Sequence, residues 1–343
     1  MSNPWTTPRK LGVLGTGSAL PGPAISSAAL VARAAERFGL ANPRRALAIT
    51  ERMGIATRHL VRDFADAREV ARPGDSNPEL SARAVRSALD QAGLPIESIN
   101  YLIGHTTSPA QHLPANIALV ADHIGYAGPH LELRQACTGF ANALMIAHGL
   151  ITINPGARVA IVGSETASTY LDPATLDSQP GQLVNFVQMG DGAGAVVVSA
   201  PGCGATIDAT WYGAVGMGRA PGISLAVGAD QFEHDFEAIR AEGHVLFDAG
   251  RASAADLGYD LADAHRIIPH QVSGRIGAQM ARHFGLCPTR AFVNADRVGN
   301  TGSAAIWIAL DALRGEARTG DMAIVLGAEA SKFMFGGFAY THG

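Results

Sequence analysis

The strongest constraint on this chain is that it contains the same pattern twice. The run Arg134-Gln-Ala-Cys137-Thr-Gly-Phe-Ala matches Arg297-Val-Gly-Asn300-Thr-Gly-Ser-Ala at an offset of 163 residues (300 − 137). Three further blocks recur in the same order, at offsets between 160 (278 − 118) and 165 (270 − 105). Such order predicts a duplicated unit. We therefore expect two halves, residues 1–200 and 201–343, related by a pseudo-twofold axis.

Each half alternates short apolar runs with amphipathic stretches. Residues 159–162, 195–198 and 323–326 are aliphatic runs typical of fully buried strands. Residues 78–93 and 273–285 place apolar side chains at helical spacing, and each ends in a glycine. This alternation predicts an α/β fold in which helices cover sheets.

The composition excludes several classes of protein. A hydrophobic fraction of 47%, a charged fraction of 16% and a net charge of −4 oppose a disordered chain or a nucleic-acid binder. Residues 11–32 carry no charge, but their glycines and prolines favour a strand and loop over a membrane span. The three cysteines and the histidines show no metal-ligand spacing. We expect a soluble cytoplasmic protein without a metal, a membrane contact or a nucleic-acid partner.

Cys137 is the most informative single residue. It follows a strand-like run and precedes an apolar helix predicted over residues 138–150. The start of a helix offers unpaired N–H groups, which lower a thiol pKa and favour thiolate. The same N–H groups stabilise an oxyanion when sulfur attacks a thioester carbonyl. Cys203 and Cys287 lack this context, and we expect them to be structural.

His270 and Asn300 also lie at junctions between predicted strands and helices. In the duplicated pattern Asn300 is the counterpart of Cys137, and His270 is the counterpart of His105. Ligand sites of α/β proteins gather at the carboxyl ends of strands. A histidine N–H and an asparagine amide near a thiolate would stabilise a thioester enolate. Glu165 recurs as Glu329, for which we expect a structural role between the halves.

These motifs resemble the thiolase superfamily, and within it the β-ketoacyl-ACP synthase III group of condensing enzymes. Cys137 in Ala-Cys-Thr-Gly-Phe, His270 in Pro-His-Gln and Asn300 in Gly-Asn-Thr-Gly-Ser-Ala match the catalytic residues of that group. The glycine-rich run 190–195 and the closing loop 335–338 match as well. The resemblance spans nearly the whole chain. It implies a thiolase fold, with pseudo-twofold halves in a layered αβαβα arrangement, and a homodimer.

The resemblance also implies residues that bind substrate. Backbone N–H groups of Cys137 and Gly336 are expected to form the oxyanion hole. Arg52 and Arg275 match basic residues that contact the partner bearing the pantetheine arm. Leu113 replaces an aromatic residue that often lines the acyl pocket from the neighbouring subunit. Ala48 replaces the tryptophan that stacks on the adenine of CoA, which favours a carrier-protein donor or a differently held CoA.

The implied activity is that of an acyltransferase of fatty acid or polyketide biosynthesis. Cys137 accepts an acyl group from acyl-CoA or acyl carrier protein, which are substrates, and no cofactor is required. A malonyl thioester then loses CO₂, and its enolate, stabilised by His270 and Asn300, attacks the acyl group to give a 3-oxoacyl product. Leu113 stands where nondecarboxylative relatives have a glutamate base, which disfavours that reaction.

Two alternatives remain open at this stage. In the first, the same three residues transfer an acyl group from Cys137 to a hydroxyl or amine of a natural product, with His270 as base. In the second, the chain is a non-catalytic partner subunit. The presence of all three residues argues against the second alternative.

Overall fold

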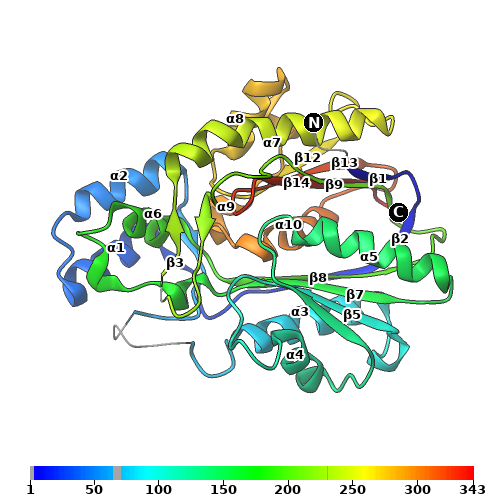
Figure 1. The fold of residues 1–343 in the computed structure, drawn as a ribbon, viewed down its shortest axis with the longest axis horizontal. Coiled ribbons are helices and arrows are strands. Elements are labelled where there is room, and N and C mark those ends of the chain that lie inside the picture. The colour runs from blue at the N-terminus through cyan, green and yellow to red at the C-terminus, as the bar shows by residue number, and fades with distance from the viewer. Residues whose placement is uncertain (1–3, 65–70, 230) are drawn as a thin grey trace.

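The computed structural model describes residues 4–64, 71–229 and 231–343. Within them ten strands form one hydrogen-bonded sheet, which doubles back at the junction of β2 and β9 so that two layers face each other (Figure 1). The first layer contains β2 (Leu11–Ala19), β5 (Tyr101–His105), β6 (His130–Leu133), β7 (Val159–Glu165) and β8 (Gly192–Ser199). The second contains β1 (Trp5–Thr7), β9 (Thr206–Ala214), β12 (Arg266–Pro269), β13 (Met322–Glu329) and β14 (Met334–Thr341).

The strand order repeats between the two layers. In the first, β2, β8 and β7 are antiparallel neighbours, and β5 and β6 then follow in parallel. In the second, β9, β14 and β13 are antiparallel, β12 follows in parallel, and a parallel bridge from Ile267 to Ala291 takes the place of β6. The duplication therefore extends from sequence to topology. The predicted division near residue 200 falls between β8 and β9, although β1 pairs with β9.

Helices complete five layers, which confirms the expected αβαβα arrangement. The outer helices are α3 (Asn77–Ala92) and α4 (Asn116–Ile124) on the first layer of strands, and α7 (Phe236–Asp256) and α8 (Ile276–Phe284) on the second. Between the layers lie α5 (Gly139–Ile153) and α10 (Ala305–Arg314) (Figure 1). Helix α5 has no charged residue and contacts strands of both layers, as expected for a helix buried on all sides. Phe140, Trp307 and Phe338 pack ring to ring in this central layer.

The two predicted outer helices form close to their expected positions. Helix α3 ends at Gly93, whose left-handed φ of 62° suits glycine. Helix α8 ends similarly at Gly285, but it begins at Ile276, three residues later than predicted. Within the described residues no helix is both long and apolar enough to cross a membrane.

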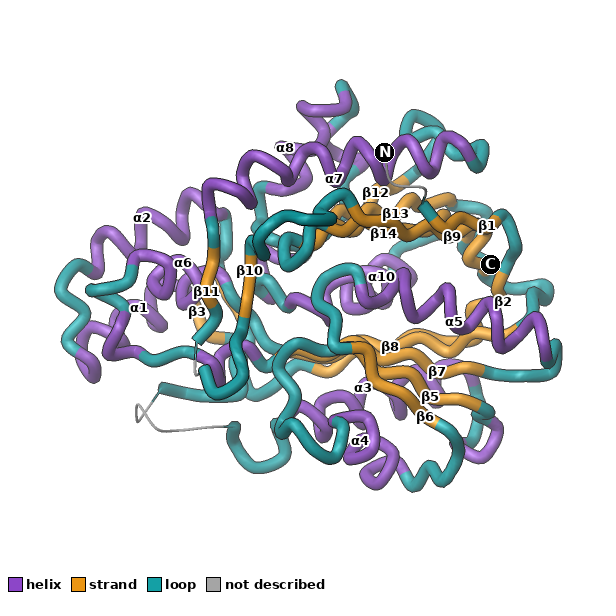
Figure 2. The backbone as a smooth tube through the Cα atoms, viewed as in Figure 1, coloured by secondary structure: helices purple, strands orange, loops and turns teal. Residues whose placement is uncertain are grey.

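Smaller elements gather beside one end of the layers (Figure 2). They are α1 (Ser27–Phe38), α2 (Pro43–Met53), α6 (Pro180–Gln188), α9 (Ala295–Val298), β3 (Ile25–Ser26), β4 (Thr57–Arg58), β10 (Ile223–Ser224) and β11 (Glu233–His234). The hairpin of β10 and β11 is tied to α6 by the amide of Gln182, which donates to the carbonyl of Phe232 at 2.8 Å. This end of the molecule contains the candidate site.

Candidate active site

A cavity of about 420 Å³ is bordered by residues of both halves. Cys137 and Asn300, which occupy equivalent corners of the duplicated unit, both line it. Cys137 lies between β6 and α5, and Asn300 lies shortly before α10. The structure therefore brings together two of the three predicted catalytic residues from positions 163 residues apart (300 − 137).

The environment of Cys137 differs from the expected one. Helix α5 begins at Gly139 with Thr138 as its N-cap, so the sulfur lies ahead of the first helical residue. The Glu329 carboxylate accepts hydrogen bonds from the Thr138 backbone N–H at 2.9 Å and hydroxyl at 2.7 Å. A carboxylate thus already binds the N-terminal end of α5, where free N–H groups were expected to stabilise the thiolate. Burial, followed by the charges of Glu329 and Glu165, raises the Cys137 pKa well above its usual value. The prediction of a lowered thiol pKa was wrong.

Glu165 makes a similar contact from the first half to the second. It ends β7 of the first half, and its carboxylate accepts hydrogen bonds from the Ser303 N–H at 3.2 Å and hydroxyl at 2.8 Å. Ser303 belongs to the turn that leads into α10 of the second half. Each buried central helix is therefore capped by a glutamate from the opposite half. The carboxylates of Glu165 and Glu329 both accept hydrogen bonds at the start of a helix, in keeping with the structural role expected for them.

Hydrogen bonds of its backbone groups hold Asn300 in place. Its N–H donates to the Gln188 carbonyl at 2.8 Å, and its carbonyl accepts from the Gly190 N–H at 3.0 Å. The side-chain oxygen accepts the Gly302 N–H at 3.1 Å. This bond leaves the amide NH₂ as the donor available to a substrate. Gly190, in the glycine-rich run, permits the approach because an added Cβ there would lie 1.8 Å from the Val298 carbonyl oxygen.

His270 lies at the end of β12, as predicted. Its backbone N–H donates to the Leu326 carbonyl at 2.8 Å, and the Gln271 amide fixes the turn by donating to the Pro269 and Phe292 carbonyls. The ring is 3% exposed, its Nδ1 has no hydrogen-bond partner, and burial lowers its pKa to about 4. The imidazole is therefore neutral at pH 7. His270 is not among the described residues that line the cavity.

Gly336, predicted to supply an oxyanion N–H, lies within β14 and pairs with Gly327 on one side and Tyr212 on the other. The expected closing loop is therefore a strand at this position. Ala330 and Ser331, in the loop before β14, line the cavity. The oxyanion role of Gly336 stays a prediction.

Arg52, Arg275 and Leu113, which were predicted to bind substrate, are not among the residues that line the cavity. Arg52 is exposed near the end of α2, and the Arg275 side chain packs beside Gly54, where an added Cβ would lie 3.0 Å from its Nε. The two arginines therefore lie on neighbouring segments. Leu113 is 86% exposed, and the preceding residue, His112, lines the cavity.

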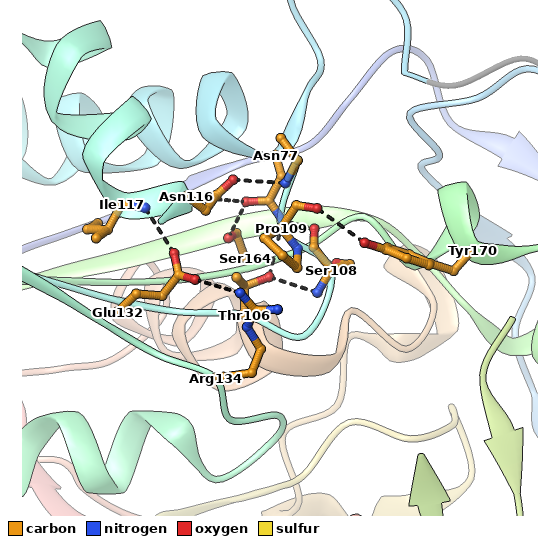
Figure 3. A network of polar contacts seen from close by, with 11 residues as sticks. Asn77, Thr106, Ser108, Pro109, Asn116, Ile117, Glu132, Arg134, Ser164 and Tyr170 are labelled. Atoms are coloured by element: carbon orange, nitrogen blue, oxygen red, sulfur yellow. Dashed lines mark hydrogen bonds and ion pairs between the residues drawn. The ribbon is translucent and has the colours of Figure 1, made fainter. Parts of the chain in front are cut away.

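Buried polar contacts anchor the loop that carries Thr107 and His112 (Figure 3). Asn77 donates to the Ser108 carbonyl at 2.8 Å, and the Tyr170 hydroxyl donates to the Pro109 carbonyl at 3.2 Å. Thr107 donates to Glu165 at 2.8 Å. The cavity wall on this side is consequently held by hydrogen bonds along much of the loop.

Sequence reasoning missed one wall of the cavity. Asn185 and Gln188 of α6 line it, as do Phe232 and His234 of the hairpin. The amides recur every third residue from Gln182, a helical spacing that could have marked a polar helix face. The hairpin strands are only two residues long, so their sequence contains no periodic pattern that could have predicted this wall. Among the described residues no group of three or more histidines, cysteines or acids could hold a metal ion.

Comparison with known proteins decides the family. Residues 131–216 match the family described as 3-oxoacyl-[acyl-carrier-protein (ACP)] synthase III, and residues 254–336 match its C-terminal part. The β-ketoacyl-[acyl-carrier-protein] synthase III of Rhizorhabdus wittichii is 31% identical over 97% of this chain and 100% of its own length. The chain belongs to this family. The match makes it an acyl-transferring condensing enzyme with a thiolase fold.

Solved structures agree with that assignment. The synthase III FabH of Pseudomonas aeruginosa is 27% identical, with a TM-score of 0.78 over 97% of this chain and 98% of its own. AbyA1, described as a tetronic acid condensing enzyme, is 25% identical, with a TM-score of 0.85 over 96% of this chain and 99% of its own. OleA of Xanthomonas campestris, at 20% identity and a TM-score of 0.77, shares the fold.

Proposed function

We propose that this synthase III-family enzyme performs a decarboxylative condensation. An acyl thioester of CoA or acyl carrier protein transfers its acyl group to the Cys137 sulfur and releases the donor thiol. A malonyl thioester then loses CO₂, and the resulting carbanion attacks the acyl carbonyl, which expels the sulfur and gives a 3-oxoacyl thioester. Loss of CO₂ generates the carbanion, so the step needs no strong base.

The observation that carries this proposal is that Cys137 and Asn300 line one cavity. The Asn300 amide NH₂ is free to donate to the thioester oxygen, where negative charge develops as CO₂ leaves. Neutral His270 supports the same task as a second N–H donor. Leu113, with its apolar side chain, provides no base beside the cavity.

Intact-protein mass spectrometry with a panel of acyl-CoA and acyl-ACP donors tests the first half-reaction. We expect one acyl adduct per chain, absent in Cys137→Ala. Adding ¹⁴C-carboxyl-labelled malonyl thioester should then release labelled CO₂ together with a 3-oxoacyl product. The absence of any adduct would favour a non-catalytic subunit and overturn the proposal.

A second candidate is acyl transfer from Cys137 to a hydroxyl or amine. The similarity to AbyA1 supports it, because a tetronic acid is a cyclic ester. The same experiment separates the two reactions. An ester or amide product without labelled CO₂ indicates transfer, whereas CO₂ release with a new carbon–carbon bond indicates condensation.

We also infer that the enzyme acts as a cytoplasmic homodimer. The resemblance to synthase III enzymes supports this inference, because Leu113, which is exposed here, occupies a position that often lines the acyl pocket of the neighbouring subunit in them. Light scattering of the wild-type protein and of Leu113→Asp tests it. We expect a dimer that dissociates in the variant, and a monomeric wild type would contradict it.

A further inference from the structure

One face of α6 is built from amide side chains. Gln182, Asn185 and Gln188 recur at three-residue spacing, and residues three apart share a helix face. The other face carries apolar side chains, including Leu183 and Phe186, in a hydrophobic cluster. The amides therefore face away from that cluster, and Asn185 and Gln188 line the cavity.

This polar face begins next to the reacting groups. The Gln188 carbonyl accepts the Asn300 N–H at 2.8 Å, so the carboxyl end of α6 lies one hydrogen bond from the catalytic segment. Asn185 precedes Gln188 by three residues, which corresponds to about 4.5 Å along the helix axis. The amides thus extend from Asn300 along one wall of the cavity.

His234, on β11, extends the same row. Its Nδ1 lies 3.2 Å from the Asn185 side-chain nitrogen, and the ring also hydrogen-bonds the Phe232 carbonyl. Burial lowers the His234 pKa to about 4, which keeps the ring neutral at pH 7. These contacts hold His234 beside Asn185. Its ring stacks on Phe236 at 5.2 Å, which fixes the orientation.

These contacts leave two amide side chains with unused hydrogen-bonding capacity at the cavity. Within the described chain no hydrogen bond reaches the Asn185 side-chain oxygen or the Gln188 side-chain amide. A saturated alkyl group would desolvate these groups without pairing them, which disfavours its binding.

We propose that Asn185 and Gln188 recognise a hydroxyl or keto oxygen on the acyl group delivered to Cys137, with His234 holding Asn185 in place. The enzyme then discriminates in favour of oxygenated acyl donors and against saturated chains of equal length. A site built around hydrogen bonds rejects an analogue that lacks the bonding group more strongly than an apolar pocket rejects a change in length. This inference rests on the proposed acylation of Cys137.

The test measures the rate of Cys137 acylation by hexanoyl-, 3-hydroxyhexanoyl-, 3-oxohexanoyl- and 5-hydroxyhexanoyl-CoA, followed by intact mass. We expect at least one oxygenated donor to load about tenfold faster than hexanoyl-CoA. Gln188→Leu keeps a side chain of similar size without its amide and should reduce this ratio to about one. Gln188→Asn retains an amide and should keep part of the preference. Leu225→Ala, a change at a half-buried apolar lining residue, should alter all donors by a similar factor.

The outcomes separate the two proposals. Equal loading of saturated and oxygenated donors by the wild type overturns this inference and leaves Cys137 acylation intact. A preference that persists in Gln188→Leu also overturns it. A uniform loss of loading in that variant, with the ratio unchanged and thermal unfolding as in the wild type, assigns the row to the pantetheine arm instead. If no donor forms an adduct, the proposed function itself fails.

Discussion

The Glu329 carboxylate, at the end of β13, accepts two hydrogen bonds from Thr138, the residue next to the nucleophilic cysteine. The contact caps α5, but it also places a negative charge near Cys137. Burial and, after it, this charge raise the Cys137 pKa, so the resting sulfur is a thiol at neutral pH. Acylation must remove a proton during the reaction, and its rate should rise with pH above neutrality.

Replacing Glu329 by glutamine should make Cys137 more reactive. The substitution removes the charge that, after burial, raises the thiol pKa most, and the glutamine oxygen can still accept from Thr138. The pH profile of alkylation by iodoacetamide should shift to lower pH, with a severalfold faster rate at neutral pH. Glu165→Gln serves as the matched control and should shift the profile less. An unchanged profile in Glu329→Gln would show that burial alone sets the pKa.

Asn300→Asp should separate the two half-reactions. Aspartate keeps the oxygen that accepts from Gly302 but removes the NH₂ donor and adds a negative charge. We expect the Cys137 adduct to form while labelled CO₂ release from malonyl thioester falls by about 10²–10³-fold. Loss of the adduct as well, with unfolding as in the wild type, would contradict the assigned role.

Gly190→Ala should affect stability and activity together. The added methyl would meet the Val298 carbonyl at 1.8 Å and push apart the segments that hold Asn300. We expect the free energy of unfolding to fall by about 1–3 kcal/mol in urea titrations. Gly202→Ala, where no atom lies within 4 Å of the added Cβ, is the control and should change stability little.

His105 should make the enzyme sensitive to acid. Burial lowers its pKa to about 3, and its Nε2 accepts the Trp307 indole N–H at 3.1 Å. The unfolded state takes up a proton near pH 6.5, so stability is complete above that pH and falls as pH drops toward 3. His105→Gln keeps an acceptor without titrating. Its melting temperature should decline less than that of the wild type between about pH 6.5 and about pH 4.5.

Much of the fold could be predicted because the duplication constrained it. The offset between Cys137 and Asn300 implied equivalent corners, and a doubled α/β unit leaves few ways to bury two central helices. Gly336 shows where motif matching failed. Its sequence context suggested a loop, but β14 begins at Met334, and strand pairing depends on contacts with β9 and β13 that no local pattern encodes.

The sequence predicted which residues form the site, but it did not predict the electrostatic environment of those residues. Cys137 was placed before a helix correctly, yet the thiol pKa depends on burial and on Glu329, which lies 192 residues further along the chain (329 − 137). His234 was missed for a related reason. Its chemistry comes from a contact with Asn185 that only the packing of the hairpin on α6 creates.

The crossed capping by Glu165 and Glu329 means that neither half is self-sufficient. A fragment ending near residue 200 would lack Glu329 at the start of α5. The complementary fragment would lack Glu165 at the start of α10. Because each half completes a helix of the other, we expect the two halves to unfold together as one cooperative unit.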